Sequence, residues 1–451
     1  MWQIILMKAL VSRIYADPKN ERFFSWMKLI TITSGAQIVV QVVGLLSGII
    51  VIRLLPTHEY GLYTLANTML GTMIVLADGG VSIGVMAQGA NVWQDRKQLG
   101  VVMVSGFDLL KKFAIVSLVI SSPVLIYLLL HHGASWPMTL LIIASSIPAF
   151  YAALSDSMLE IAPKLHQSIL PLQKNQVNVG IGRLLLSGIM LFIFPWAVAA
   201  IIASGLPRIY GNIKLRKIAS FLTEADQLPD PAVKKDIIRV WKKSMPGLIY
   251  YCISGQLTVW LVSLFGNTAA VAQIGALGRI VMLLNLFSAV FSTLVAPRYA
   301  RLPITPSLLK KKMLQIQLGL VGFFIAVIGL VYLFSGQILW VLGDKYIGLD
   351  DELVLLMIGS CFSLMTGLVY FLTSGRGWIL TPWIYVTGSV VATIIGLFLF
   401  NISSMQGVLL FNIFISVCQL LMYIVYSWYM LTKPIIKGEE EALESSAKKN
   451  L

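Results

Sequence analysis

Residues 29–86 decide the fold, and they read LITITSGAQIVVQVVGLLSGIIVIRLLPTHEYGLYTLANTMLGTMIVLADGGVSIGVM. Two apolar runs, Leu29–Leu54 and Leu62–Met86, flank a short polar connection that begins at Arg53 and ends at Gly61. A helix needs about 20 apolar residues to cross a hydrocarbon core of about 30 Å. Each run is therefore long enough to span a membrane, and Asp78 is the one charged residue inside the second run.

Both runs also carry small and polar residues at steps of about three and four, the spacing of one helix face. In the first run these residues are Ser34, Gln37, Gln41, Gly44 and Gly48. In the second run they are Thr64, Asn67, Gly71, Asp78 and Ser82. Because a polar face is costly in lipid, we expect these faces to contact other helices or a water-filled cavity.

The composition predicts an all-α polytopic membrane protein. Of the 451 residues, 57% are hydrophobic and 12% are charged, against about 25% charged residues in soluble domains. Helices satisfy their own backbone hydrogen bonds in lipid, and the runs lack the alternation of transmembrane β-strands. We expect about twelve spans of membrane length: 29–53, 61–86, 113–131, 136–155, 177–195, 197–213, 246–265, 269–297, 313–335, 351–374, 380–400 and 405–432.

The longest cytoplasmic connection after the leader divides these spans into two groups of six, an arrangement that many transporters derive from internal duplication. The expected parts are a leader (1–28), an N-terminal six-helix lobe (29–213), a linker (214–245), a C-terminal six-helix lobe (246–432) and a tail (433–451). Residues 99–112 are expected to extend the third span at the cytoplasmic surface. The charged stretch 156–174 is expected to form a loop or an interfacial segment.

The basic residues predict which side of the membrane each connection faces. With both termini in the cytoplasm, the outer connections keep only Arg53 and Lys345, while the inner segments hold nearly all the other lysines and arginines. This distribution follows the positive-inside rule. It explains the formal net charge of +14 through topology and contact with anionic lipids, so no nucleic-acid partner is needed.

The sequence shows no sign of an enzyme, a metal site or a cofactor. The chain has four histidines and three cysteines, with no cluster at zinc-site spacing. Cys252, Cys361 and Cys418 all fall in apolar runs, which favours small buried side chains over disulfides. There is no G-x-x-x-x-G-K-[ST] nucleotide loop and no pair of acid/base carboxylates within a span.

Arg279 is the most informative single residue, because it lies inside the eighth span in the sequence GALGRIVMLL (275–284). A cation at that depth costs at least about 2.5–3.5 kcal/mol and must face the bundle interior or water. One interpretation is a ligand for an anionic group such as phosphate, which suits the guanidinium fork. The alternatives are a structural ion pair with Asp78 and an arginine that extends to the interface.

Several further residues are candidates for a binding site. Arg53, at the outer mouth of the first span, and Arg183, near the start of the fifth, are cation candidates or interface anchors. Asp78 is a candidate for coupling to a proton or cation, or a residue paired near the cytoplasmic interface. The amide side chains suit sugar hydroxyls or, equally, hydrogen bonds between helices; they are Gln37, Gln41, Asn67, Gln256 and Asn412.

The connection after the first span carries a resemblance to a known family. Residues 53–65 read RLLPTHEYGLYTL, and DGGVS (78–82) follows. This pattern resembles the R-x-L-G-P-x-E-Y-G start of the polysaccharide-biosynthesis flippases, the Wzx-type O-antigen members of the multidrug/oligosaccharidyl-lipid/polysaccharide (MOP) exporter superfamily. Pro56 stands where that family commonly has glycine, and Thr57 where it has proline. The sequence GDKY (343–346) resembles a second family motif, G-x-x-Y.

The resemblance implies a flippase in the bacterial cytoplasmic (inner) membrane. It implies that the cargo is an oligosaccharide on a polyprenyl pyrophosphate, moved from the cytoplasmic to the outer leaflet by alternating access. It also implies two six-helix lobes around a central cavity whose cations receive the pyrophosphate, with Arg279 as the first candidate and Arg53 and Arg183 behind it. Lipids surround the protein, and a polysaccharide polymerase or export protein is a candidate partner.

Three other functions remain open at the level of sequence. A MATE-like cation-coupled antiporter should carry several intramembrane acids, whereas Asp78 is the only clear one. A membrane-embedded glycan polymerase should have a large basic outer loop, and the outer connections here are short. An assembly factor that moves no cargo is the third.

Overall fold

The computed structural model describes residues 18–432 except 225, 301, 303, 304, 375, 377 and 379. Side chains are described from Gly35 onward, with further gaps at Gln37 and within the helices 231–265 and 284–300. The described residues form helices and no strands, as the composition predicts.

The N-terminal half contains two long helices that exceed the predicted spans. The helices are α2 (Pro18–Leu54), α3 (Thr57–Asp78), α4 (Val81–Val92), α5 (Arg96–His131), α6 (Trp136–Leu159), α7 (Ile161–Leu165), α8 (Ile169–Ile193) and α9 (Ala197–Ser220). The predicted extension of the third span is confirmed, because α5 is continuous from Arg96.

The C-terminal half begins with another long helix, α10. Its helices are α10 (Pro231–Phe265), α11 (Thr268–Val281), α12 (Leu284–Ala300), α13 (Pro306–Leu333), α14 (Ser335–Leu342), α15 (Asp350–Ser374), α16 (Pro382–Leu399) and α17 (Met405–Thr432), with a short 3-10 turn, η1 (Asp344–Tyr346). The outer connection after α13 therefore holds helical structure of its own.

Two predicted spans are broken, and one predicted loop is helical. The second span breaks at Gly79 and Gly80, whose φ values of 48° and 98° lie in the left-handed region that glycine adopts without a steric penalty. The eighth span breaks between α11 and α12. The stretch 156–174 was predicted as a loop or an interfacial segment. The loop is wrong, because most of the stretch lies in α6, α7 and α8, and the interfacial segment stays a prediction.

Nine helices are long and apolar enough to cross a membrane, counted over the described part of the chain. The other three predicted spans correspond to α2, α9 and α10. Side chains are described for only part of α2 and α10, so these two helices are not counted over their full lengths. Within the part of α2 whose side chains are described after Gln37, Ile38–Leu54 is an apolar helical segment.

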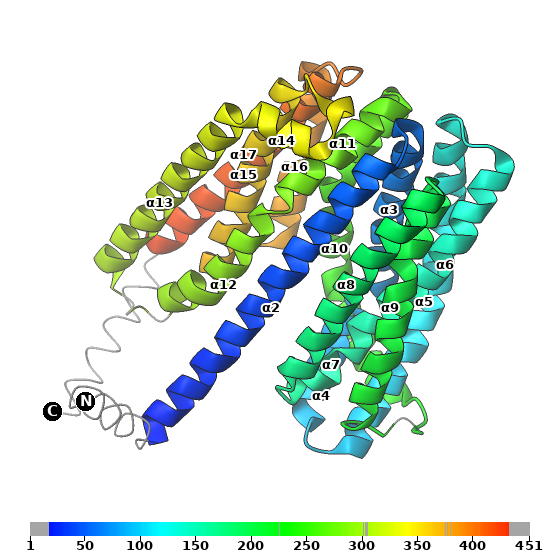
Figure 1. Cartoon of the computed structure of the whole chain (residues 1–451). Coiled ribbons are helices and arrows are strands. Elements are labelled where there is room, and N and C mark those ends of the chain that lie inside the picture. Colours follow the sequence, from blue (N-terminus) through cyan, green and yellow to red (C-terminus); the bar gives the residue numbers. More distant parts are fainter. Residues whose placement is uncertain are drawn as a thin grey trace, which may run out of the picture.

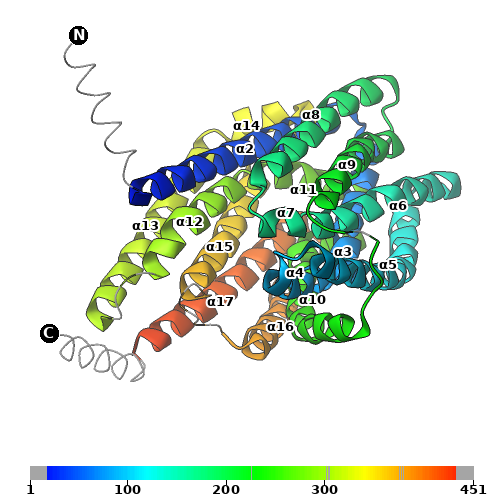
Figure 2. The same ribbon diagram turned by 90° about the horizontal axis from the view of Figure 1, so that it is seen from below.

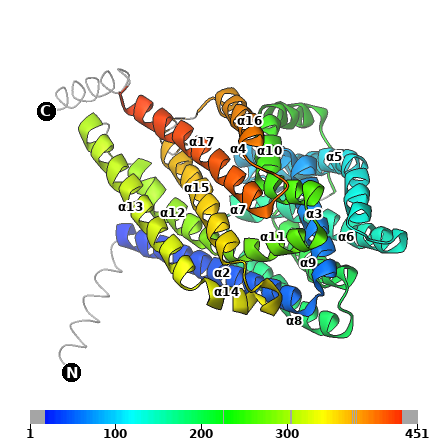
Figure 3. The same ribbon diagram turned by 90° about the horizontal axis from the view of Figure 1, so that it is seen from above.

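The helices form two groups that diverge toward one end of the molecule (Figure 1). One group contains α3 to α9, and the other contains α12 to α17. Seen from either end, α2 and α10 lie on opposite sides of the junction, with α3 and α11 between them (Figures 2 and 3). Helix α3 is central, because it packs against α5, α6 and α9 of its own half and against α10 and α11.

The two halves meet tightly at the end that the charges predict to be outside, here called the predicted outer end. A β-carbon on Gly61 of α3 would lie 2.7 Å from the backbone oxygen of Thr268, at the start of α11. A β-carbon on Gly275 of α11 would lie 2.5 Å from the hydroxyl oxygen of Thr64 on α3. Only glycine permits so close an approach, so α3 and α11 seal this end.

A second contact at the predicted outer end joins α2 to the region after α13. Arg53 donates hydrogen bonds to the backbone oxygens of Trp340 (2.6 Å) and Val341 (3.0 Å) at the end of α14. In return, Lys345 donates one to the backbone oxygen of Leu55, just after α2 (2.8 Å). Each cation therefore binds carbonyls at the negative end of a helix in the other half of the chain.

Candidate functional site

A cavity of about 300 Å³ opens among α2, α3, α6, α8 and α9, and one residue from the other half of the chain, Arg279 on α11, completes its lining. Three arginines line it: Arg183, Arg208 and Arg279. The other polar lining residues are Ser47, Tyr63, Asn67, Asp156, Glu160, Asn175, Gln176, Ser187 and Ser204.

Two glycines one turn apart on α2 make room for two of the arginines. A β-carbon on Gly44 would lie 3.4 Å from Nη2 of Arg183. A β-carbon on Gly48 would lie 3.1 Å from Cδ of Arg279. Gly44 and Gly48 belong to the predicted polar face of α2. Because both are small, one arginine from each half of the chain can pack against the same part of α2.

Among the described residues, no carboxylate lies within ion-pair distance of Arg279. Its guanidinium lies near the side chains of Tyr60 and Tyr63 on α3, and its Nη1 lies 3.9 Å from the sulfur of Met282. The ion pair with Asp78 considered from the sequence does not form among the described residues.

Arg183 also has no counter-ion among the described residues. No carboxylate in the described part of the chain lies within ion-pair distance of its guanidinium, and its buried Nε has no hydrogen-bond partner there. Arg183 and Arg279 are close enough for their charges to repel each other. The cavity therefore presents two uncompensated cations, an arrangement that favours an anionic ligand.

A polar network that was not predicted from the sequence lies on the same cavity. Asp156 on α6 accepts hydrogen bonds from Nε of Arg208 (3.0 Å) and from Asn212 (2.9 Å) on α9. One turn along α6, Glu160 accepts from Lys164 (2.7 Å) and Gln176 (3.1 Å). Asp156 and Glu160 are four residues apart, and so are Arg208 and Asn212. Residues at this spacing share one helix face, so the sequence did contain a sign that two helices could face each other with complementary side chains.

The other predicted site residues lie in different places. Asn67 lines the cavity, whereas Gln41 is half-buried on α2 and is not a lining residue. The side chains of Gln37 and Gln256 lie outside the described residues. Asn412 bonds to the hydroxyl of Thr258 (2.9 Å).

Asp78 and Arg53 both have structural partners away from the cavity. Asp78 ends α3, and its carboxylate accepts from the backbone nitrogen (2.9 Å) and hydroxyl (2.7 Å) of Ser82 at the start of α4. Arg53 binds the end of α14 and lies over the ring of Trp340, with Cζ 5.4 Å from the ring centroid.

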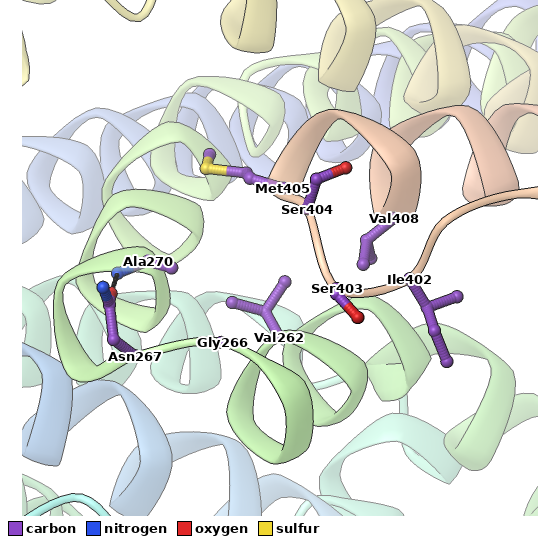
Figure 4. Close-up of a pocket in the computed structure, with 9 residues that line it drawn as sticks. All are labelled: Val262, Gly266, Asn267, Ala270, Ile402, Ser403, Ser404, Met405 and Val408. Atoms are coloured by element: carbon purple, nitrogen blue, oxygen red, sulfur yellow. Dashed lines mark hydrogen bonds between the residues drawn. The ribbon is translucent and has the colours of Figure 1, made fainter.

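Within the described residues, no group of three His, Cys, Asp or Glu side chains could hold a metal ion. Cys361 and Cys418 are free. A second cavity of about 210 Å³ lies at the predicted outer end between the α10–α11 and α16–α17 connections. Figure 4 shows Asn267, Ser403 and Ser404 around it, and its lining carries no charged side chain.

Comparisons of sequence find no relative for this chain. No protein-family model matches it, and no curated protein matches it significantly.

Solved structures do match. The fold is similar to the inward-facing conformation of a multidrug resistance MATE family transporter of the MOP superfamily, with a TM-score of 0.71 at 16% identity over 88% of this chain and 96% of that one. For an outward-facing structure of such a transporter the TM-score is 0.59 at 16% identity, over 93% and 98%.

A MOP superfamily transporter from Pyrococcus furiosus gives a TM-score of 0.60 at 14% identity, over 93% of this chain and 97% of that one. At such identities the comparisons define the fold. The chain therefore has the all-α, MATE-like fold of the MOP superfamily, with two helical lobes.

Proposed function

We propose that this protein is a flippase that moves a polyprenyl-pyrophosphate-linked oligosaccharide between the leaflets of a bacterial inner membrane. It works by alternating access, opening its cavity first to one side of the membrane and then to the other. The glycolipid is delivered for assembly of a surface polysaccharide.

The observation that carries this proposal is a pair of arginines that have no counter-ion in the part of the chain that the structure describes. Arg183 comes from one half of the chain and Arg279 from the other, and both line one cavity. Placing two cations in a membrane interior is costly unless something compensates them. A pyrophosphate supplies negative charge and acceptor oxygens that match guanidinium forks.

The rest of the cavity fits the other parts of the cargo. Hydroxyl and amide side chains such as Asn67, Gln176 and Ser204 line it, and such groups hydrogen-bond to sugar hydroxyls. The prenyl chain needs no polar site, because it can stay in lipid while the headgroup crosses. The cavity then has to shelter only the polar part of the molecule.

The fold supports alternating access but does not choose the cargo. The halves are sealed at the predicted outer end, and the TM-score is higher for the inward-facing structure than for the outward-facing one. In the Pyrococcus furiosus transporter, the reverse polarity of the binding pocket suggests a different function for that protein. We therefore propose an anionic cargo because of the charge of the cavity, and not because of the fold.

A MATE-like cation-coupled antiporter is the second candidate. It is favoured by Asp156 and Glu160, which place two carboxylates on the same cavity. Both are already neutralised, by Arg208 at 3.0 Å and by Lys164 at 2.7 Å. The uncompensated charge in the cavity is therefore positive, which favours an anionic cargo over a cationic drug.

The proposal is tested in a strain that lacks this chain. Lipid-linked oligosaccharides are extracted, and their leaflet is determined with a glycosidase or lectin that acts only from outside. We expect complete repeat units trapped on the cytoplasmic side, and their mass identifies the cargo. Normal outward exposure in a strain with no substituting flippase would contradict the proposal.

A further inference from the structure

Histidines gather at the contact between the two halves. The chain has four histidines, and His58, His131 and His132 lie together at the predicted outer end. The rings of His131 and His132 are 5.3 Å apart and perpendicular. The Nε2 atom of His58, near the start of α3, lies 3.0 Å from the backbone oxygen of His132.

His132 links the halves directly. It follows α5 and is 4% exposed. Its Nε2 lies 2.8 Å from the backbone oxygen of Ser263 on α10, and its Nδ1 lies 3.1 Å from the hydroxyl of Thr268 on α11. The Thr268 hydroxyl is also 3.2 Å from the backbone oxygen of His132. One imidazole therefore joins the α5–α6 connection to both ends of the α10–α11 connection.

Burial without a counter-ion favours a neutral imidazole. The backbone oxygen of Ser263 can only accept, so Nε2 of His132 carries a proton and donates it. The hydroxyl of Thr268 donates to the backbone oxygen of His132, and its oxygen faces Nδ1. A second proton on the ring would be buried, and no carboxylate in the described part of the chain pairs with His132.

The groups around the ring also disfavour a positive charge. The titratable neighbours are His131 beside it and His58 on α3, while the described residues of α10 and α11 that contact the ring contribute the hydroxyls of Ser263 and Thr268. Glu59, next to His58, is engaged with the backbone nitrogen of Ala197 (2.7 Å). Burial lowers the pKa of His132; the hydrogen bond to the backbone oxygen of Ser263 opposes this shift, and the charges of His131 and His58 add to it, so that the pKa is lowered overall.

We propose that His132 is a proton-sensitive latch, which holds the predicted outer end closed when neutral and releases it when protonated. This inference rests on the alternating access proposed above, and it assigns the proton as the ion that promotes opening. The closed state buries a neutral ring, and the open state exposes the same ring to water. Proton binding therefore favours the open state by linkage.

The sign of the pH dependence follows from the lowered pKa. In the open state His132 has an ordinary histidine pKa of about 6.5. Above that pH the ring is neutral in both states, and the closed contact keeps its full stability. As the pH falls below about 6.5, the open state gains protons that the closed state does not. The open population then rises up to tenfold for each pH unit until the pKa of the closed state is reached.

The test measures the separation of the halves by electron-spin resonance. Spin labels are placed at Ser135→Cys and Ser403→Cys, two exposed outer-end positions in different halves. Alanine replaces the three native cysteines, and the full chain is studied in lipid nanodiscs without glycolipid. Between about pH 8 and about pH 5, on either side of the histidine pKa, we expect the long-distance population to increase severalfold.

Matched variants assign the response to one ring. His132→Gln should show no pH dependence, whereas His131→Gln should keep the pH response. If His132→Gln does not fold, the double variant His58→Gln/His131→Gln keeps His132 alone and should retain the response. Three results would each overturn the latch. The native chain could show no pH response, His132→Gln could show an unchanged response, or the double variant could have lost the pH response. The spin-label test contains no glycolipid and is therefore independent of transport. If the pH response is intact but the protein flips no glycolipid in a separate assay, only the proposed function is contradicted.

Discussion

Gly48 on α2 and Arg279 on α11 lie in direct contact across the two halves of the chain. A β-carbon on Gly48 would lie 3.1 Å from Cδ of Arg279. The glycine therefore sets how deeply the arginine enters the cavity. One turn earlier, Gly44 stands in the same relation to Arg183, at 3.4 Å from Nη2.

Gly48→Leu should displace the Arg279 guanidinium and slow transport. Overpacking a tight contact costs about 1–3 kcal/mol, which corresponds to roughly a five- to hundredfold loss. The measurement is the rate of glycolipid flipping in liposomes. Gly35→Leu is the matched control, because Gly35 lies on the same helix with nothing within 4 Å of its β-carbon position. Equal rates for the two variants would show that the contact has no role.

Arg279→Lys should retain part of the activity. Lysine keeps the charge but loses the planar fork that binds two oxygens of a phosphate. We expect a rate between those of the native protein and Arg279→Ala, measured in the same liposome assay. A rate equal to that of Arg279→Ala would mean that the fork is indispensable, whereas full activity would show that charge alone is needed and would remove the argument from guanidinium geometry.

Asp156→Asn should destabilise the N-terminal half. The substitution removes the charged acceptor that Arg208 and Asn212 share. Hydrogen bonds to charged groups contribute about 1.5–3 kcal/mol, and the loss should fall at the low end because the Arg208 side chain is 40% exposed. A double-mutant cycle with Arg208→Gln, followed by thermal unfolding in detergent, measures the coupling. Strict additivity would mean that the two side chains do not interact.

Arg53→Ala and Lys345→Ala should each loosen the predicted outer end. Each removes a cation from helix-terminal carbonyls of the other half, an interaction of about 0.3–1 kcal/mol. We expect a roughly two- to fivefold increase in the open population, read from spin labels at Ser135→Cys and Ser403→Cys. Lys311→Ala, in the exposed first turns of α13, is the control. An unchanged population in both variants would mean that the reciprocal contacts do not hold this end closed.

Much of the fold follows from the sequence, because apolar runs of membrane length leave little freedom. The long helix that contains 99–112 was predicted from the placement of its charges. The break between α11 and α12 was not, because Met282 and Leu283 carry no helix-breaking signal. Asp156 was assigned to a loop or an interfacial segment because charged residues interrupt the stretch 156–174. The compensation of Asp156 by Arg208 and Asn212 depends on tertiary contacts with α9.

Part of the candidate site was visible in the residues themselves. Arg183, Arg279 and Asn67 were selected as polar groups within apolar runs, and the structure brings them to one cavity. Arg53 was selected by the same rule, yet it binds carbonyls at the end of α14. Sequence shows that an intramembrane arginine needs a partner, but only the packing of helices shows whether that partner is a backbone oxygen or an open cavity.

The most direct test of the proposed transport is flipping of a lipid-linked oligosaccharide by the purified protein in liposomes. The native protein should expose labelled glycolipid to an outside-only glycosidase, and Arg279→Ala should slow this by roughly ten- to a hundredfold. Arg239→Ala, whose side chain is 75% exposed, should retain the native rate. Native flipping by Arg279→Ala, or no flipping by the native protein under conditions where it is folded, would contradict the proposed role of the cavity.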